Sequence, residues 1–252
     1  MSEVWIDHTS IAQWLDPNCW SNYFTRVETI LGAKLTHLDE NDPVRRRVRS
    51  LADAGTYVCA FGPHETSRWL FGRMQSVGIE LSVLLRRDNL LNSLTWQVPM
   101  SFLQRDPSCS CLRQLFDLGN ETLRPFYSLG DELSRITAKK KKSGSVDLAA
   151  ELLGVFWLTY FNAAYVTFFG KSKFEALPGA TLNKDGSARL ALADCPMLVP
   201  DGLREQVAHT LGRLTFVDPD DDRLIKLRGQ HALTFDDLRQ FEESSAKAQD
   251  SR

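Results

Sequence analysis

The sequence lacks the short motifs that mark the common enzyme classes. It holds no Gly-x-Ser-x-Gly elbow, no Gly-x-Gly-x-x-Gly turn and no Gly-x-x-x-x-Gly-Lys-Ser/Thr loop. Respectively, these motifs expose a serine nucleophile, admit a dinucleotide and cradle phosphates on backbone N–H groups. We therefore expect no enzymatic activity and no bound cofactor, although a fold can still bring distant residues together.

Neither sign of charge is in excess, and no long uninterrupted apolar run is present. Lysine and arginine total 30 against 32 aspartates and glutamates, a formal net charge of -2, which gives no global attraction to nucleic acid or to an anionic membrane. The most apolar window, 148–169, is interrupted by Glu151, Gly154 and Asn162, so it predicts buried core instead of a membrane span. The chain begins with an acidic stretch, unlike a signal peptide, and we expect a soluble cytoplasmic protein.

Metal-ligating patterns fail at specific positions. Cys109 and Cys111 are one residue apart, too close for the usual zinc spacing, and no histidine lies near them in the sequence. The run that begins at Asp218 resembles the start of a calcium loop, but Arg223 stands where glycine is needed and Gly229 where glutamate is needed. We expect no metal. The five cysteines are an odd number, which favours a reducing compartment.

Residue periodicity predicts helices followed by an antiparallel sheet in the first half. Apolar residues from Trp20 to Leu31, at spacings of three and four, predict a helix that Pro17-Asn18 precedes and that stops at Gly32. A second, basic helix is predicted after Pro43, with its arginines on a solvated face. The period then changes to two, which predicts a four-stranded meander. Its strands are expected at 57–61, 69–71, 79–85 and 94–98.

The remainder of the chain predicts mixed elements. A helix is expected over 109–118, ending at Gly119, whereas 125–131 fits a turn or a strand and 152–161 fits a helix or a strand. Further on, the pattern predicts a helix at 163–169, a hairpin that turns at Asp185-Gly186, and a helix over 201–214 that Asp201 caps. A short tail helix opened by Thr234 precedes an end that we expect to be disordered after residue 243.

The fold class predicted from these elements is α+β, an antiparallel β-meander with flanking helices, which allows two similar α+β halves. We expect the first half at 1–138 and the second at 147–233. A flexible Lys/Ser/Gly linker is expected between them at 139–146, and a polar tail at 234–252.

Two surface features are candidates for binding a partner, and one for chemistry. The acidic run Asp220, Asp221 and Asp222 could present carboxylates to a basic surface, or could be a solvated loop. Trp69 and Trp96 would mark a docking site if they are exposed on the open face of the sheet, because tryptophan buries a large area at low entropic cost. His64 and Glu65 form the best acid/base pair, which an exposed turn explains equally well.

A pattern in the second half resembles immunity proteins of bacterial polymorphic toxins and type VI secretion effectors. The pattern covers about 152–214 and consists of Trp157-Leu158-Thr159-Tyr160-Phe161, Tyr165, Phe169-Gly170, Leu177-Pro178-Gly179, Gly186, Leu190, Leu192 and Pro196, followed by an amphipathic helix. It departs from the group at the hairpin, which reads Lys184-Asp185-Gly186-Ser187 in place of a glycine pair. The resemblance implies a cytoplasmic antidote that binds a cognate toxin stoichiometrically, and one similar subgroup neutralises nucleases of the restriction-endonuclease type.

Three classes of function therefore stay open. An immunity protein needs a complementary surface and no chemistry of its own. An adaptor or chaperone for a secreted effector would need an exposed apolar groove. An enzyme with an unrecognised site would need a deep cleft that converges on a group such as His64 or Glu65.

Overall fold

The computed structural model describes residues 3–12, 14–40, 43–87, 91–139, 148, 150–218, 220 and 232–250. The chain divides into two compact units, unit 1 over Met1–Gly130 and unit 2 over Asp131–Arg252. Both contain helices and antiparallel strand pairs, so the predicted α+β class is confirmed. Most of the expected linker at 139–146 lies outside the described residues.

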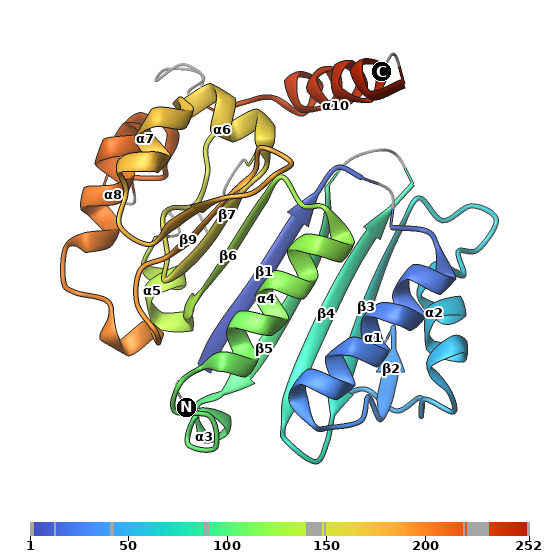
Figure 1. Ribbon diagram of the computed structural model, residues 1–252. Coiled ribbons are helices and arrows are strands. Elements are labelled where there is room, and N and C mark those ends of the chain that lie inside the picture. The colour runs from blue at the N-terminus through green and yellow to red at the C-terminus, as the bar shows by residue number, and fades with distance from the viewer. Residues whose placement is uncertain are drawn as a thin grey trace. The chain divides into compact units, whose positions relative to one another are not determined.

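Unit 1 is built on a sheet with the strand order β2-β3-β4-β5-β1-β6. The strands are β1 (Glu3–Ser10), β2 (His37–Asp39), β3 (Ser67–Met74), β4 (Ile79–Arg86), β5 (Asn92–Pro99) and β6 (Tyr127–Glu132), the last of which crosses the division between the units. The helices are α1 (Pro17–Leu31), α2 (Leu51–Cys59), α3 (Met100–Leu103) and α4 (Ser110–Leu123). Helices α1, α2 and α4 lie over one face of the sheet (Figure 1).

The core of unit 1 lies between this sheet and its helices. On the central strands every second side chain is buried: Ile79, Leu81, Val83 and Leu85 on β4, and Leu94, Trp96 and Val98 on β5. Helix α1 buries Trp20, Tyr23, Phe24 and Val27 against them. It begins where the Asp16 carboxylate accepts a hydrogen bond from the backbone N–H of Asn18. It ends at Gly32 in the left-handed conformation, the stop that the sequence predicts.

Unit 2 contains a smaller sheet and more helices. Its strands β7 (Leu158–Phe161), β9 (Ala188–Ala191) and β8 (Ala180–Leu182) are antiparallel neighbours. Its helical elements are α5 (Leu133–Ala138), α6 (Ala163–Phe169), α7 (Lys171–Ala176), η1 (Pro196–Leu198), α8 (Leu203–Gly212), η2 (Arg213–Thr215) and α10 (Phe235–Asp250). The predicted helix at 163–169 and the hairpin with its Asp185-Gly186 turn are confirmed.

Aromatic rings and one ion pair hold unit 2 together. Phe161, Phe169 and Phe174 lie within 5.4 to 6.1 Å of one another, measured between ring centroids. Arg204 contacts both carboxylate oxygens of buried Asp131 at 2.7 and 3.0 Å and also donates to the carbonyl of Pro196. A buried pair of this kind requires both partners, because either charge alone would be uncompensated.

Two predictions for the segment 43–61 are wrong. Residues after Pro43 are extended, and the helix begins only at Leu51, where the Ser50 hydroxyl accepts a hydrogen bond from the backbone N–H of Asp53. The expected strand at 57–61 belongs largely to that helix, α2. Its buried residues Ala54 and Val58 are four apart, so the helical period decides the element and the apparent alternation does not.

Several element boundaries also differ from the predictions. Helix α4 continues through Gly119 to Leu123, so Gly119 is not a helix stop. Glycine is needed there for packing, since a Cβ at position 119 would lie 2.2 Å from the His8 ring. Helix α8 begins after Gly202, and Asp201 does not cap it. Thr234 does open the last helix, exchanging hydrogen bonds with Asp237, but that helix extends to residue 250 where disorder was expected.

Candidate interaction surface

The sheet of unit 1 has one covered and one open face. Among its described residues, no helix covers the face opposite α1, α2 and α4 (Figure 1). Side chains that point to this face are exposed or half-buried, in alternation with the buried core positions. We call this the open sheet face, and it is formed by Trp5, Asp7, Trp69, Phe71, Arg73, Glu80, Ser82, Leu84, Ser93, Thr95 and Gln97.

A stacked aromatic pair is the most prominent feature of the open sheet face. The Trp69 side chain is 54% exposed, and its ring lies 6.2 Å from the ring of Phe71 at an interplanar angle of 16°. Leu84 stands opposite Trp69 on the neighbouring strand, and Arg73 beyond the pair forms an ion pair of 2.6 Å with Glu80. An apolar patch with a polar surround is typical of the centre of a protein interface.

An extra strand at the sheet edge continues the open sheet face. The backbone N–H of Leu38 donates to Arg46 O at 3.0 Å and that of Val48 to Thr36 O at 2.9 Å, so residues 46–48 pair antiparallel with β2. His37 and Arg47 are directly opposite each other in this pairing. The side chains of Arg45, Arg47 and Arg49 are exposed and alternate with half-buried neighbours. We call these three residues the arginine row.

Two interactions hold the arginine row at the edge. The guanidinium of Arg46, which points away from the row, lies 3.7 Å above the ring of Tyr57 on α2, a cation–π contact. At the start of the segment, the Asp39 carboxylate accepts hydrogen bonds from the backbone N–H groups of Arg45 and Arg46 at 3.2 and 3.1 Å. The arginines are therefore exposed as predicted, but on a strand instead of a helix.

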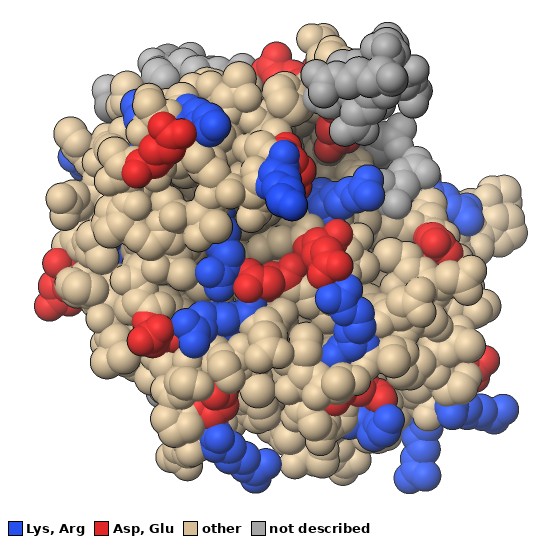
Figure 2. All heavy atoms as spheres, in the orientation of Figure 1, with Lys and Arg blue, Asp and Glu red and all other residues tan. Residues whose placement is uncertain are grey.

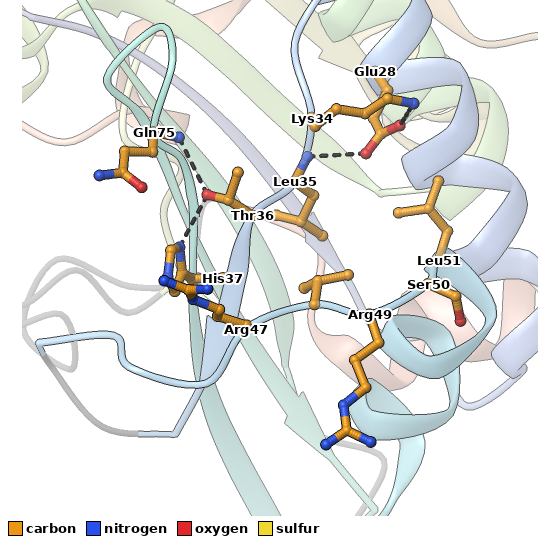
Figure 3. Close-up of a pocket in the computed structure, with 11 residues that line it drawn as sticks. Glu28, Lys34, Leu35, Thr36, His37, Arg47, Arg49, Ser50, Leu51 and Gln75 are labelled. Carbon is orange, nitrogen blue, oxygen red and sulfur yellow. Dashed lines mark hydrogen bonds and ion pairs between the residues drawn. The ribbon is translucent and has the colours of Figure 1, made fainter.

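A cleft of about 540 Å³ adjoins the arginine row (Figure 3). It is lined by Glu28, Lys34, Leu35, Thr36, His37, Arg47, Val48, Arg49, Ser50, Leu51 and Gln75. The Glu28 carboxylate already has partners within the protein: it accepts hydrogen bonds from the backbone N–H of Leu35 at 2.9 Å and from Lys34 Nζ at 2.6 Å. Arg49 extends away from the cleft wall (Figure 3). The cleft thus combines one neutralised acid with several basic side chains.

Charge is mixed on the face of the molecule turned to the viewer in Figure 2. Lysine and arginine side chains are interspersed there with aspartate and glutamate (Figure 2). A second cavity, of about 320 Å³, lies among Arg46, Arg47, Arg49 and Asp53. The edge of unit 1 is therefore locally basic although the whole chain carries a net charge of -2.

The two tryptophans singled out from the sequence lie on opposite faces of the sheet. Trp69 is on the open sheet face. Trp96 is fully buried on the covered face, where its Nε1–H donates to the Tyr23 hydroxyl at 2.9 Å. Trp96 therefore lacks the exposure that a docking residue requires.

Only part of the acidic run can be placed. Asp220 is exposed, and its backbone N–H donates to the Asp218 carboxylate at 3.1 Å. Asp218 is itself partly neutralised by Arg213 at 3.1 Å. Asp221, Asp222 and the later positions of the calcium-like pattern lie outside the described residues.

His64 and Glu65 occupy an exposed turn. The Glu65 carboxylate accepts a hydrogen bond from the backbone N–H of Gly62 at 2.6 Å, and the Glu65 N–H donates to the carbonyl of Gly62. These bonds close the turn between α2 and β3. These hydrogen bonds to Gly62 explain the position of the Glu65 side chain as part of the turn, without a catalytic role.

A buried polar cluster in unit 1 was not anticipated from the sequence. His8 Nδ1 lies 3.0 Å from Ser128 Oγ and 3.2 Å from Asn120 Oδ1, and Ser128 donates to Asn120 at 2.7 Å. The three residues are 112 and 8 positions apart along the chain, so no motif joins them. Burial lowers the pKa of His8 to about 3, which keeps the imidazole neutral. All three side chains belong to the interior of unit 1.

No group of His, Cys, Asp and Glu side chains in the described ranges has the arrangement of a metal site. Cys19, Cys59 and Cys111 are free thiols, whereas Cys109 and Cys195 are disulfide-bonded. The odd number of cysteines therefore did not indicate their state. Within the same described ranges, no helix combines the length and apolarity of a membrane-spanning segment.

Comparison with known proteins identifies a likeness of fold. No protein-family model matches the chain, and no curated protein sequence matches it. A solved structure, "Pseudomonas aeruginosa T6SS protein PA0821", is similar with a TM-score of 0.61 and 13% sequence identity, and the match covers 92% of this chain and 78% of that one. At this identity the similarity concerns the fold alone.

Proposed function

We propose that this chain is an immunity protein associated with type VI secretion, which binds a cognate toxin and neutralises it stoichiometrically without chemistry of its own. The observation that carries the proposal is the exposed, stacked pair Trp69 and Phe71 on an uncovered sheet face. Large aromatic side chains in such a position are typical of interface centres.

Two further observations support the proposal. The fold resembles that of a protein whose name places it in the type VI secretion system, over 92% of this chain. The motif pattern over 152–214 resembles immunity proteins, and its residues form the hairpin and core of unit 2. The partner would therefore be a toxin, with a nuclease effector as the first candidate.

Co-expression tests this function. The open reading frame that neighbours the gene is expressed alone and together with this chain in a host cell. We expect the neighbour to arrest growth, this chain to restore growth, and the two products to elute together from a sizing column. A harmless neighbour, or a toxic one whose product does not bind, contradicts the proposal. Binding without restored growth indicates an adaptor or chaperone for the effector instead.

The aromatic pair allows a sharper version of the same experiment. Because Trp69 is exposed and outside the core, its replacement by alanine should leave the fold intact and weaken the complex by about 2 kcal/mol or more, roughly thirtyfold in the dissociation constant. Replacing Leu214, which is 69% exposed in unit 2, provides the matched control. Equal affinity of the Trp69→Ala and Leu214→Ala variants would remove the open sheet face from the proposal.

The cytoplasmic location expected from the sequence stays a prediction. Disulfide-bonded Cys109 and Cys195 are more typical of an oxidising compartment. Cell fractionation, with thiols alkylated at the moment of lysis, distinguishes the two. Cytoplasmic location predicts that the protein is found in the cytoplasmic fraction with these cysteines alkylated.

A further inference from the structure

We propose that the edge of unit 1 formed by the arginine row binds an acidic extended segment of a protein partner, which adds to the sheet as a further strand. The identity of the partner as a protein rests on the proposed function. The site itself is argued from the backbone and side chains at the edge.

The backbone of the edge strand is open to pairing. His37 and Arg47 face each other between the two hydrogen bonds that join Leu38 to Arg46 and Val48 to Thr36. In an antiparallel pair, residues in such a position direct their own N–H and C=O groups away from each other. The N–H and C=O of Arg47 therefore point outward, and no described residue hydrogen-bonds to them. An edge strand of this kind is a template for a strand from another chain.

The side chains beside this backbone determine the charge of the guest. Arg45, Arg47 and Arg49 are exposed on one face, and the register of β2 with β3 places His37 next to Arg73 on that same face. Of the nearby acids that are described, Glu80 is paired with Arg73 and Glu28 with Lys34. Glu40 is paired with Arg68, and Asp53 borders the cavity that Arg47 and Arg49 line. Asp39 accepts hydrogen bonds from backbone N–H groups of Arg45 and Arg46. Carboxylates on alternate residues of a guest strand would meet the arginine row at close range.

The arginine row could also attract the phosphate backbone of a nucleic acid. The backbone N–H and C=O of Arg47, unpaired among the described residues, favour a peptide strand over a phosphate backbone. A phosphate chain has only acceptor oxygens, so it can use the N–H of Arg47 but leaves the carbonyl without a donor. A peptide strand satisfies both groups. The neighbouring exposed pair Trp69 and Phe71 on the same sheet face then gives the remainder of the protein partner an apolar surface to cover.

Charge reversal at the row provides the first test. The R45E/R49E variant and a control, R26E/R105E, change the net charge equally, and the control arginines are exposed or surface-paired away from the edge. Affinity for the product of the neighbouring open reading frame is measured by calorimetry. We expect R45E/R49E to weaken binding by about a hundredfold and the control to stay within about threefold of wild type. Wild-type binding should weaken between about 0.05 M and about 0.5 M salt.

Backbone pairing is tested separately at position 47. Arg47→Ala removes the charge and keeps the N–H, whereas Arg47→Pro removes both without breaking a backbone hydrogen bond to any described residue. We expect Arg47→Pro to bind about tenfold more weakly than Arg47→Ala. Circular dichroism checks that both variants are folded, and if the proline variant is not, the charge-reversal pair decides. Equal binding of the two folded variants overturns strand addition.

A probe independent of the partner separates this inference from the proposed function. Poly-L-glutamate should bind wild type saturably and the R45E/R49E variant much less. If the neighbouring product does not bind but poly-L-glutamate does so in this way, the function is wrong and the acidic-segment site stands. If the product binds wild type and R45E/R49E equally, the function stands and the site is wrong. Tighter binding of single-stranded oligothymidylate than of poly-L-glutamate also overturns the site, in favour of nucleic acid.

Discussion

Trp96 and Trp69 belong to the same sheet of unit 1 but lie in opposite environments. Trp96 is fully enclosed between the sheet and α1, with its indole N–H bound to Tyr23. Trp69, two strands away in the order β3-β4-β5, is 54% exposed and stacks only on Phe71. The covered face holds the core of unit 1, and no described helix of unit 1 lies over the open face. The difference teaches that strand alternation identifies two faces, whereas the helices decide which of them is core.

The largest expected loss of stability follows from removing a large side chain from the core on the covered face. Trp96→Ala removes a fully buried indole and should lower the free energy of unfolding by about 3 to 5 kcal/mol. Urea denaturation of the full chain measures this change, with Trp69→Ala as the matched control. Equal losses in the two variants would mean that the two faces do not differ as described.

The His8 cluster on the covered face should make stability depend on pH. Burial lowers the folded-state pKa of His8 from 6.5 to about 3, so the unfolded chain takes up a proton first as the pH falls. The stability that neutral His8 gives the folded state is fully present above about pH 6.5 and is lost progressively toward pH 3. The free energy of unfolding should fall by about 3 kcal/mol between pH 6.5 and pH 4.

Urea midpoints measured across this pH range check the assignment to His8. The His8→Gln variant should lose that part of the pH dependence, whereas His64→Gln, at an exposed position, should retain it. A wild-type slope that survives in His8→Gln would assign the effect to other groups.

A smaller loss is expected when the Trp96 indole loses its acceptor. Tyr23→Phe leaves the buried Nε1–H of Trp96 without its 2.9 Å hydrogen bond and should cost about 1 to 2 kcal/mol. The same substitution in a Trp96→Phe background should cost much less, because no N–H remains to be satisfied. A double-mutant cycle from the four unfolding curves measures the coupling, and additive losses would argue against it.

The smallest effect on stability should come from the open face. Trp69→Ala is expected to change the free energy of unfolding by no more than about 0.5 kcal/mol, as is usual for exposed positions. Thermal unfolding of the isolated protein measures it. A loss comparable with that of Trp96→Ala would show that Trp69 is part of the core in solution.

The sequence was sufficient for the elements with strong and unambiguous periodicity. Helix α1, which stops at Gly32, and strands β3, β4 and β5 follow from local spacing and the glycine stop. The first strand was missed because His8 occupies a buried position that alternation assigns to an apolar residue. The partners of its Nδ1, Asn120 and Ser128, come from distant segments, so only the tertiary structure shows which groups meet that nitrogen.

The candidate surface was predictable only in part. Alternation on β3 places Trp69 on one face, but the absence of a covering helix in unit 1 is a tertiary property. The arginine row was expected on a helix, since Val44 and Val48 are spaced by four. What overrides that spacing is the pairing with Thr36 and Leu38 and the two N–H groups bound by Asp39. These contacts join residues six or more positions apart, beyond the reach of helical spacing.

The arginine row also has a consequence for contacts between identical copies of the chain. An exposed strand edge pairs readily with its own image, and a two-fold axis at Arg47 would place Arg47 against Arg47 and Arg45 against Arg49. Each cross-strand pair within the arginine row would then join two positive charges, which disfavours the pairing. The side chains that attract an acidic guest therefore also keep the protein from joining to itself edge to edge.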